Sequence, residues 1–593
     1  MKSYINKIIK WILCVYVVVL PWLVYIKNLY YNADEKKLII FKEDGVVDYF
    51  LYGKSLITIA VAVILFILLL IEIIKYKEKI FDFYNKKDRI VCICIALYMV
   101  CTLMSYICSK YKNLALTGGF GNCEGTVILI SYVVLFLAAK YVVASSLEFG
   151  DINKTIYRIV LIEAVILMIF TWIEYLYKPI VEIVSGQDMS LVDNMIGLTF
   201  YNPAYCAAFT LLLEPLCVLY FAMAKTLREY ILWGILSVST FFSCILTRTS
   251  AAFYLIIVEG IVVFVTCFCM LQQCNNKKNI IKKICVLIGL IFAFILISTV
   301  SGKNIFENVS ASSLNKNIPI HKEDYYKIED INISENELEI KGIENSIICR
   351  VNDNKQITFY NQDNDIVNVS VSGSEIDFPA PYECVKAGIE NSALWFDLGY
   401  KGKIRFYMND GKFYPMLIDG SIIGNIKNTN SSVNTKMDGL FTGRGYIWRS
   451  TLPIIRHTLI FGHGAATYMM YVKQFDFVGL LNSQGTVDLL IDKPHCWYLQ
   501  IACNQGGMSL IAIMVVIIMI LFQSIKKIKD KKNSAVELMF MTSFCIAAIS
   551  FLVQGLINDS SITVNPLFWI IMGLMSAFVM KREEYSNDSN SEK

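Results

Sequence analysis

Apolar runs of about twenty residues recur along this chain and constrain its fold more than any other feature. A helix of that length crosses the roughly 30 Å hydrocarbon core of a bilayer. Only 18% of the residues are charged and 56% are hydrophobic, whereas about a quarter of the residues in soluble proteins are charged. The sequence therefore predicts an α-helical polytopic membrane protein. About twelve runs are expected, the first over residues 11–26 and the others near Val63, Ala96, Val134, Val165, Leu213, Leu236, Val258, Phe292, Val515, Ala547 and Trp569.

Lysine and arginine in the short connections between the runs set the expected orientation. The basic connections alternate with less basic ones, so they share one face of the membrane; they are residues 75–89, 225–228, 277–283 and 526–532. With that face cytoplasmic, both termini lie inside a plasma membrane that the chain crosses many times. The first run lacks a small-residue cleavage site, so we expect a retained anchor rather than a cleaved signal peptide.

A long polar interruption precedes the last three apolar runs, and we expect it outside the cytoplasm. Between residues 328 and 423, short polar and apolar stretches alternate and are broken by Asn, Asp and Gly, which predicts β-strands and turns. We interpret this part as an inserted extracytoplasmic all-β module. The expected order is a transmembrane region of about nine helices (1–301), the β-rich insertion and its Asn- and Ser-rich linker (302–436), a second extracytoplasmic loop (437–505), about three further helices (506–580) and a cytoplasmic tail (581–593).

Charge and motif content exclude several classes of function. The net charge is only +4 and no basic face is evident, which argues against nucleic-acid binding. The four histidines show no HExxH or comparable spacing, so we expect no metal site and no cofactor. Cys349 and Cys384 lie in polar sequence, where they either pair or remain free thiols.

Arginines gather beyond the β-rich insertion. Arg444, Arg449, Arg456 and His457 punctuate one amphipathic stretch, and a guanidinium binds phosphate oxygens in a bidentate manner. This cluster indicates either an anionic ligand or a basic face on lipid headgroups. Arg248 stands where two apolar runs meet on the expected outer side, so it either snorkels to the interface or binds a ligand.

Several strings together resemble the O-antigen ligase and O-antigen polymerase superfamily of bacterial membrane glycosyltransferases. LTRTSAA, residues 246–252, is similar to the family's Ser-Arg-small element, with Thr247 in place of Ser and Arg248 as the arginine. RGYIW, which begins at Arg444, and FGHG, residues 461–464, are similar to the arginine ahead of Ile-Trp and the Gly-x-Gly turn that follows it.

The most specific resemblance is HCWYLQIACNQGGMSL, residues 495–510, which is similar to the family's His-Asn-x-Tyr-Leu-Gln and later Gly-x-x-Gly. Cys496 stands where Asn is common, and Ser509 takes the place of the second glycine. Weaker resemblances are GLTFYNPAYCAA (197–208), FGNCEGTVILISY (120–132) and GLINDSSITVNPLFW (555–569). The β-rich insertion lies outside the resemblance.

The resemblance implies a GT-C-like helical fold that transfers glycan from an undecaprenyl-diphosphate-linked oligosaccharide on the outer membrane face. His495 is then the general base for an acceptor hydroxyl, and Arg444 and Arg248 stabilise the departing diphosphate. Residues 437–505 become the catalytic loop. The residues assigned to substrate binding are Arg449, Arg456, His457, Tyr498 and Gln500.

Three readings of function stay open. A composition rich in Asn, Ile, Lys and Tyr is typical of low-GC Gram-positive bacteria, which favours a polymerase of surface polysaccharide repeat units. A ligase acting on an envelope glycan or a protein acceptor shares the same donor chemistry. A transporter of the lipid-linked glycan also suits about twelve spans, but it places polar residues at the bilayer midplane, whereas the arginines here gather on one face.

Overall fold

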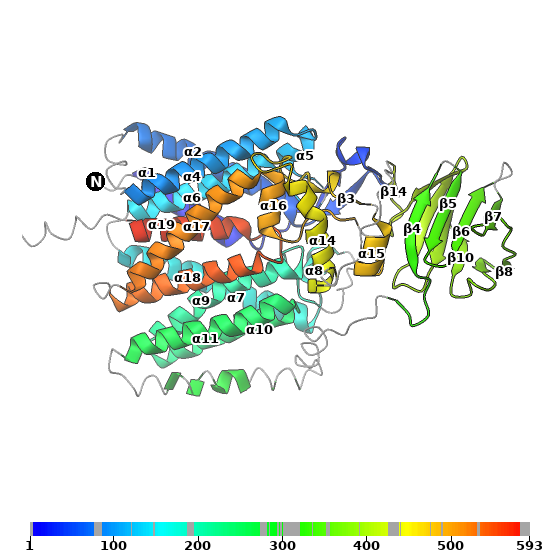
Figure 1. The fold of residues 1–593 in the computed structure, drawn as a ribbon. Coiled ribbons are helices and arrows are strands. Elements are labelled where there is room, and N and C mark those ends of the chain that lie inside the picture. Colours follow the sequence, from blue (N-terminus) through cyan, green and yellow to red (C-terminus); the bar gives the residue numbers. More distant parts are fainter. Residues whose placement is uncertain are drawn as a thin grey trace, which may run out of the picture.

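The computed structural model describes residues 4–75, 86–145, 149–186, 195–272, 321–424 and 438–580, apart from short gaps, together with scattered residues between 282 and 299. Long helices run side by side in one bundle, and a β-rich region projects from one end of it (Figure 1). The N-terminus lies at the opposite end. We call these the β end and the N end of the bundle.

Eight helices among the described residues are long and apolar enough to cross a membrane. They are α2 (Leu51–Lys75), α4 (Lys86–Cys108), α6 (Thr126–Ala144), α7 (Phe149–Leu176), α9 (Pro203–Met223), α10 (Leu227–Leu246), α17 (Gly507–Ile528) and α18 (Ala535–Gln554). Helices also form at three other expected positions, namely α1 (Tyr4–Val19), α11 (Ser250–Gln272) and α19 (Asn565–Met580).

The expected count of about twelve spans is therefore not reached in the part of the chain that the structure describes. The described parts of α1 and α19 have 16 residues each, and a simple crossing needs roughly twenty. The run expected near Phe292 falls mainly outside the described residues. The structure is that of a mostly helical, multi-pass membrane protein.

Helix α9 lies at the centre of the bundle. Its most apolar window is 94% buried, whereas that of α2 is 22% buried. The helix begins where Asn202 accepts a hydrogen bond from the backbone of Ala204 and Pro203 fills the first position, a combination that favours helix initiation. Its first turn therefore presents Tyr205 at a fixed place at the β end.

The predicted β-strands between residues 328 and 423 are confirmed. A four-stranded antiparallel sheet has the order β4–β5–β6–β7, and a six-stranded one has the order β13–β12–β11–β10–β9–β8. Leu338 and Ile347 from one sheet share a hydrophobic core with Phe396 and Phe406 from the other. Cys349 is a free thiol, and so is Cys384. The strands are β4 (Ile328–Ile333), β5 (Glu337–Gly342), β6 (Ser346–Val351), β7 (Ile357–Tyr360), β8 (Ser370–Ser372), β9 (Glu375–Asp377), β10 (Lys386–Glu390), β11 (Ala393–Asp397), β12 (Ile404–Asn409) and β13 (Lys412–Pro415).

Helices α14 (Leu440–Ile455) and α15 (Phe477–Gln484) lie between the bundle and the β-rich region, and α16 (Trp497–Asn504) lies at the β end of the bundle (Figure 1). Tyr446 of α14 and Phe477 of α15 belong to the core of the β-rich region. A further two-stranded sheet pairs β14 (Ile422–Ile423), the last strand of the insertion, with β2 (Ile39–Ile40), which lies between α1 and α2. The insertion is therefore joined to the bundle by packing and by backbone pairing.

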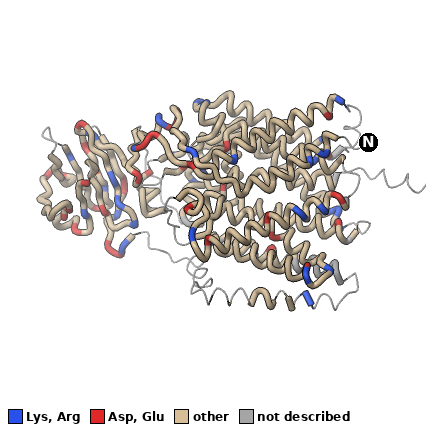
Figure 2. The backbone as a smooth tube through the Cα atoms, turned by 180° about the vertical axis from the view of Figure 1, so that it is seen from behind, with Lys and Arg blue, Asp and Glu red and all other residues tan. Residues whose placement is uncertain are grey.

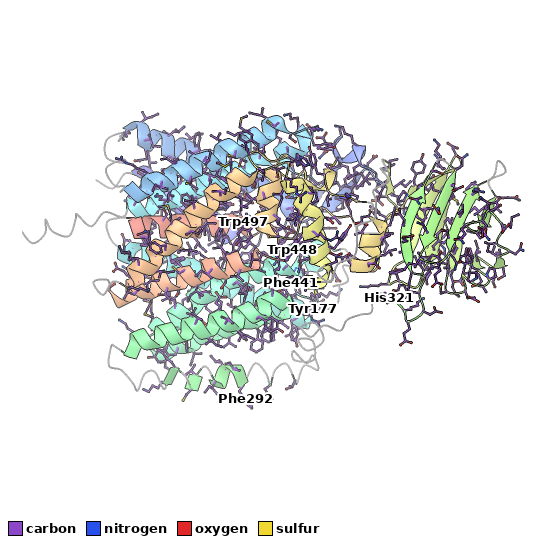
Figure 3. All side chains as sticks on the ribbon, in the orientation of Figure 1. Tyr177, Phe292, His321, Phe441, Trp448 and Trp497 are labelled. Carbon is purple, nitrogen blue, oxygen red and sulfur yellow. The ribbon has the colours of Figure 1, made fainter. Side chains whose placement is uncertain are left out.

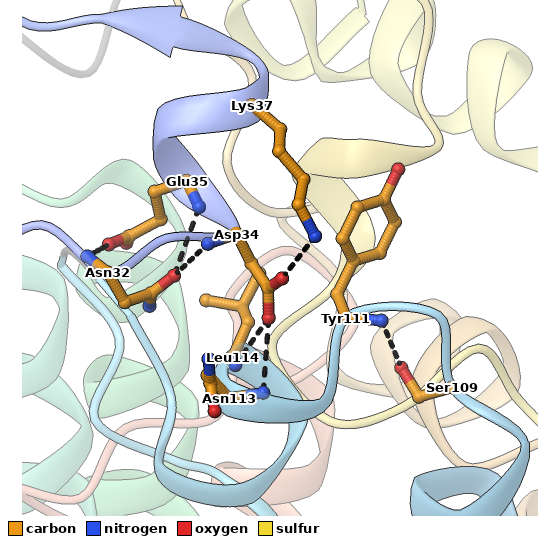
Figure 4. Close-up of polar contacts among 8 residues, drawn as sticks. All are labelled: Asn32, Asp34, Glu35, Lys37, Ser109, Tyr111, Asn113 and Leu114. Atoms are coloured by element: carbon orange, nitrogen blue, oxygen red, sulfur yellow. Dashed lines mark hydrogen bonds and ion pairs between the residues drawn. The ribbon is translucent and has the colours of Figure 1, made fainter.

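The segment between α1 and α2 also contacts the short helix α5 (Lys112–Thr117), which lies between α4 and α6. Asp34 accepts hydrogen bonds from the backbone N–H groups of Asn113 and Leu114, at 3.1 and 3.4 Å, and from Lys37 at 2.8 Å (Figure 4). A carboxylate is favourable at a helix N-terminus, where backbone N–H groups lack partners. These contacts fix the chain that leads from α5 to Glu124, ahead of α6.

Candidate active site

His495 and Asp559 form a hydrogen-bonded pair at the β end of the bundle. His495 stands just before α16, and Asp559 lies in the turn between α18 and α19. Nδ1 of His495 is 2.8 Å from Oδ2 of Asp559; the carboxyl side chain is 2% exposed and the imidazole 39%. A carboxylate at Nδ1 orients the ring and keeps a proton there, so Nε2 is left to accept another. The pair has the arrangement of a general base and its orienting group.

The backbone holds this histidine in an uncommon conformation. His495 has a φ angle of 48°, a left-handed value that costs energy for a residue with a side chain and that is common at functional sites. Two residues later, the backbone N–H of Trp497 donates to the carbonyl of Gly555 at 2.8 Å. This hydrogen bond ties the segment of His495 to the turn that carries Asp559.

Arg444 supplies a cation beside this pair. It lies in the first turns of α14 and is half-buried. Burial lowers the pKa of its guanidinium, while the charge of Asp559 and the side chain of Tyr205 act in the opposite direction. The carboxylate that orients His495 thus also stabilises the charge of Arg444.

Lys493 is a second cation at the same place. Its Nζ atom donates to the carbonyl of Gly121 at 2.8 Å, lies 3.9 Å from Oδ2 of Asp492 and is 6.0 Å from the centre of the Tyr205 ring. Burial acts to lower the pKa of Lys493, but Tyr205, Asp492 and Asp559 outweigh it and the pKa is raised. Two cations that remain charged around one general base suit an anionic ligand.

A buried polar network supports the turn of Asp559 from behind. Glu124 accepts hydrogen bonds from the hydroxyls of Tyr132 and Ser560. The backbone N–H of Ser560 donates to Oε1 of Gln500 at 2.8 Å, and the Asn565 amide donates to the Ser560 hydroxyl. Because Ser560 follows Asp559 directly, this network fixes the position of the carboxylate.

Glu124 gives a pH-dependent prediction for stability. Burial raises its pKa to about 7, against the hydrogen bonds from Tyr132 and Ser560, which lower it. A folded-state pKa above the ordinary value means that ionisation opposes folding, so stability falls as pH rises from about 4.5 to 7 and is level above that. Glu124→Gln is expected to remove a loss of about 3 kcal/mol over this interval. Thermal unfolding of the purified protein at pH 5 and pH 8 measures it, and equal pH slopes for the two proteins would contradict it.

Small cavities adjoin this network. One is lined by Tyr205, Trp497 and Asp559, and its neighbour by Glu124 and Gln500. Figure 3 shows Trp497 within the β end of the bundle and Trp448 on α14 beside it. Among the described residues, no three or more His, Cys, Asp or Glu side chains are grouped so that they would hold a metal ion.

Arg449 is engaged in a contact of its own. Its Nε and Nη2 atoms donate to the two carboxylate oxygens of Asp438 at 2.8 and 2.9 Å. Asp438 is 2% exposed and Arg449 30%. This bidentate ion pair closes the start of α14 against the preceding chain.

We expect Arg449→Ala to destabilise the fold, because it leaves a buried carboxylate without its partner. The expected loss is about 2 kcal/mol, and Asp438→Asn combined with Arg449→Ala is expected to restore part of it. Thermal unfolding of the two variants checks this. A single variant as stable as the parent but with weaker donor binding would instead assign Arg449 to the substrate.

Arg248 lies at the turn between α10 and α11 and has a φ angle of 52°. Its backbone N–H donates a hydrogen bond to the carbonyl of Ile245. The turn is at the β end, where the N–H of Ile196 donates to the carbonyl of Leu246. Ala207, on α9, packs toward α10 and α11, whereas Tyr205, on the same helix, lines the cavity of Asp559. The structure therefore places Arg248 beyond α9 from the His495 pair.

The remaining predicted residues fall into two groups. Arg456 and His457 are exposed at the end of α14. Tyr498 and Gln500 are engaged within the fold: the Tyr498 hydroxyl donates to the carbonyl of Leu552 at 2.7 Å, and Gln500 accepts from Ser560. Both of these contacts hold α16 against the end of α18 and the turn that follows it.

Sequence reasoning missed Asp559, Lys493 and Tyr205 as site residues. Lys493 stands two residues ahead of His495, and Asp559 interrupts the polar turn between the last two apolar runs. Those positions were a usable signal, but only the fold brings the three side chains to one place.

Comparison with known families adds a finding that covers this region. Residues 413–514 match the family model described as O-antigen ligase. The chain therefore carries a segment that is similar to the O-antigen ligase family. The ligase domain includes Arg444, Lys493 and His495, while Asp559 comes from outside it.

This match confirms the resemblance seen in the sequence. The protein is a membrane protein that processes glycans in the manner of the O-antigen ligases and polymerases. No curated protein and no solved structure matches the chain. The GT-C-like assignment of the fold stays a prediction.

Proposed function

We propose that the protein is a glycosyltransferase that takes glycan units from an undecaprenyl-diphosphate-linked donor on the outer face of the plasma membrane. The observation that carries the proposal is the His495–Asp559 pair flanked by Arg444 and Lys493. The proposal includes the expected topology, with both termini cytoplasmic and residues 437–505 as the catalytic loop, to which the turn after α18 adds Asp559.

In the proposed reaction, Nε2 of His495 takes the proton of an acceptor hydroxyl as its oxygen attacks the anomeric carbon of the donor. The bond between that carbon and the diphosphate oxygen breaks, and the diphosphate leaves with the electron pair. Asp559 stabilises the imidazolium. Arg444 and Lys493 stabilise the charge that develops on the leaving group. The diphosphate role of Arg248 stays a prediction, because this residue lies beyond α9 from the His495 pair.

We propose polymerisation of surface polysaccharide repeat units as the reaction, with a lipid-linked glycan as acceptor. The second candidate is a ligase that transfers glycan to an envelope or protein acceptor, and the description of the matching family favours it. The two candidates share the chemistry above and differ in the acceptor hydroxyl.

Reconstitution separates them. The purified protein in liposomes receives an undecaprenyl-diphosphate oligosaccharide, and product length is followed by gel and mass spectrometry. A ladder from the donor alone supports a polymerase, and transfer only after addition of an envelope glycan or protein supports a ligase.

The controls are Arg444→Ala, which is expected to abolish either product, and Arg350→Ala, which removes an arginine of the β-rich region paired with Glu337. Movement of the intact donor across the liposome membrane with no transfer would replace the proposal with a transporter.

A further inference from the structure

A cavity lies in the helical bundle between α1, α6, α7, α9 and α19. Its volume is about 140 Å³ and it is lined almost wholly by apolar side chains. An engineered apolar cavity of about 150 Å³ binds benzene, so this one accommodates a segment of hydrocarbon chain. The lining side chains include Leu13, Val143, Ile156, Leu213 and Ile570.

One end of the cavity lies at the N end of the bundle. Helix α6 starts just after Glu124, at the β end, so Val142 and Val143 in its last turn are at the N end. Ile152 and Ile156, in the first turns of α7, line the cavity as well. Phe209 and Leu567 line its other end, next to residues that line the cavity of Asp559. Lys10 is therefore at the end of the cavity that is remote from the candidate active site.

One basic side chain stands in the cavity wall. Lys10 of α1 lines it and is half-exposed, and its Nζ atom is 3.4 Å from the carbonyl of Asp151. The only other charged residue of the wall is Glu163, whose carboxylate accepts a hydrogen bond from Trp22 at 2.7 Å. Figure 2 marks Lys and Arg positions along the backbone near the N-terminus, at this end of the bundle.

An apolar chamber with a cation at its side suits an amphiphile that has a hydrocarbon chain and an anionic head. We propose that the cavity binds one acyl chain of an anionic phospholipid, with the lipid phosphate against Lys10. A zwitterionic phospholipid fits the same chamber but gains less from Lys10, because a lysine near an anionic headgroup favours binding electrostatically. The site goes beyond the proposed transferase function, since a donor diphosphate has to reach Arg444 at the other end.

Native mass spectrometry of the full-length, delipidated protein tests this. The probes are phosphatidylglycerol and phosphatidylcholine with identical acyl chains. Wild-type protein is expected to hold one phosphatidylglycerol at least about fivefold more tightly than phosphatidylcholine. Lys10→Glu is expected to abolish that preference, and Lys7→Glu, an exposed residue of the same helix that does not line the cavity, is expected to retain it.

A second variant tests the chamber itself. Thr155→Phe places a ring into the cavity from a half-buried position, and it is expected to weaken both lipids while the thermal unfolding midpoint is maintained. Equal binding of the two lipids by the wild type, equal losses in Lys10→Glu and Lys7→Glu, or displacement of the phospholipid by an undecaprenyl phosphate would each overturn the proposal. The last result would assign the cavity to the donor's tail.

Discussion

Replacing His495 with alanine is expected to lower the rate of glycan transfer by roughly 10²–10⁴-fold, the usual contribution of a general base. In the wild type, the imidazole of His495 lies 2.8 Å from Asp559. The alanine variant lacks this imidazole, so the proposed base for the proton of the acceptor hydroxyl is lost. Initial rates in liposomes that contain donor and acceptor measure the effect. Thermal unfolding serves as the control for folding, because the half-exposed ring contributes little to the core.

The pair makes a sharper test than the single variant. Asp559→Asn keeps the shape of the side chain but favours the wrong imidazole tautomer, so we expect a large loss from it as well. Because the two residues act as one unit, the double variant is expected to be no slower than His495→Ala alone. Multiplying losses would contradict the assignment of Asp559 as the orienting group.

Replacing Arg444 with alanine is expected to lower the transfer rate by roughly 10²–10³-fold, as for removal of one preorganised donor to a developing negative charge. The transfer rate of Arg444→Lys is expected to lie between those of the wild type and Arg444→Ala, since lysine keeps the charge but lacks the planar guanidinium. Both variants are to be compared with Arg350→Ala in the same liposomes.

Binding of inorganic diphosphate gives a readout that does not depend on turnover of the variant. We expect diphosphate to bind to the wild type through Arg444 and Lys493 and to bind more weakly to Arg444→Ala, as measured by calorimetry. A variant that retains full turnover and full diphosphate affinity would remove Arg444 from the site.

Much of the architecture was accessible from the sequence because membrane burial imposes a simple pattern. Apolar runs near Val63 and Leu213 became α2 and α9, and alternating stretches became strands such as β5 and β12. The expected count of about twelve spans stays a prediction, because the described parts of the first and last helices have 16 residues each and the run near Phe292 falls mainly outside the described residues.

The site was predicted in part for a different reason. His495 and Arg444 stand in strings with a family resemblance, whereas Asp559 and Glu124 act through contacts that span many helices. Arg449 shows the converse. Its guanidinium is a suitable group for an anionic ligand, but in the structure it forms an ion pair with Asp438. Which carboxylate meets which cation is decided by packing, and that information is absent from local sequence.

The pairing of β2 with β14 has a consequence for the order of assembly. The backbone N–H of Lys42 donates to the hydroxyl of Ser421, a contact that spans 379 residues. At about 5–20 residues per second, a ribosome needs roughly 20–80 s to make that stretch. During this time, β2 in the segment between α1 and α2 lacks its partner strand β14. An unpaired strand edge is prone to pairing with the wrong strand. Completion of the β-rich insertion is thus the step that closes the earliest part of the chain, and a nascent protein halted before Ile422 lacks the partner strand for Ile40.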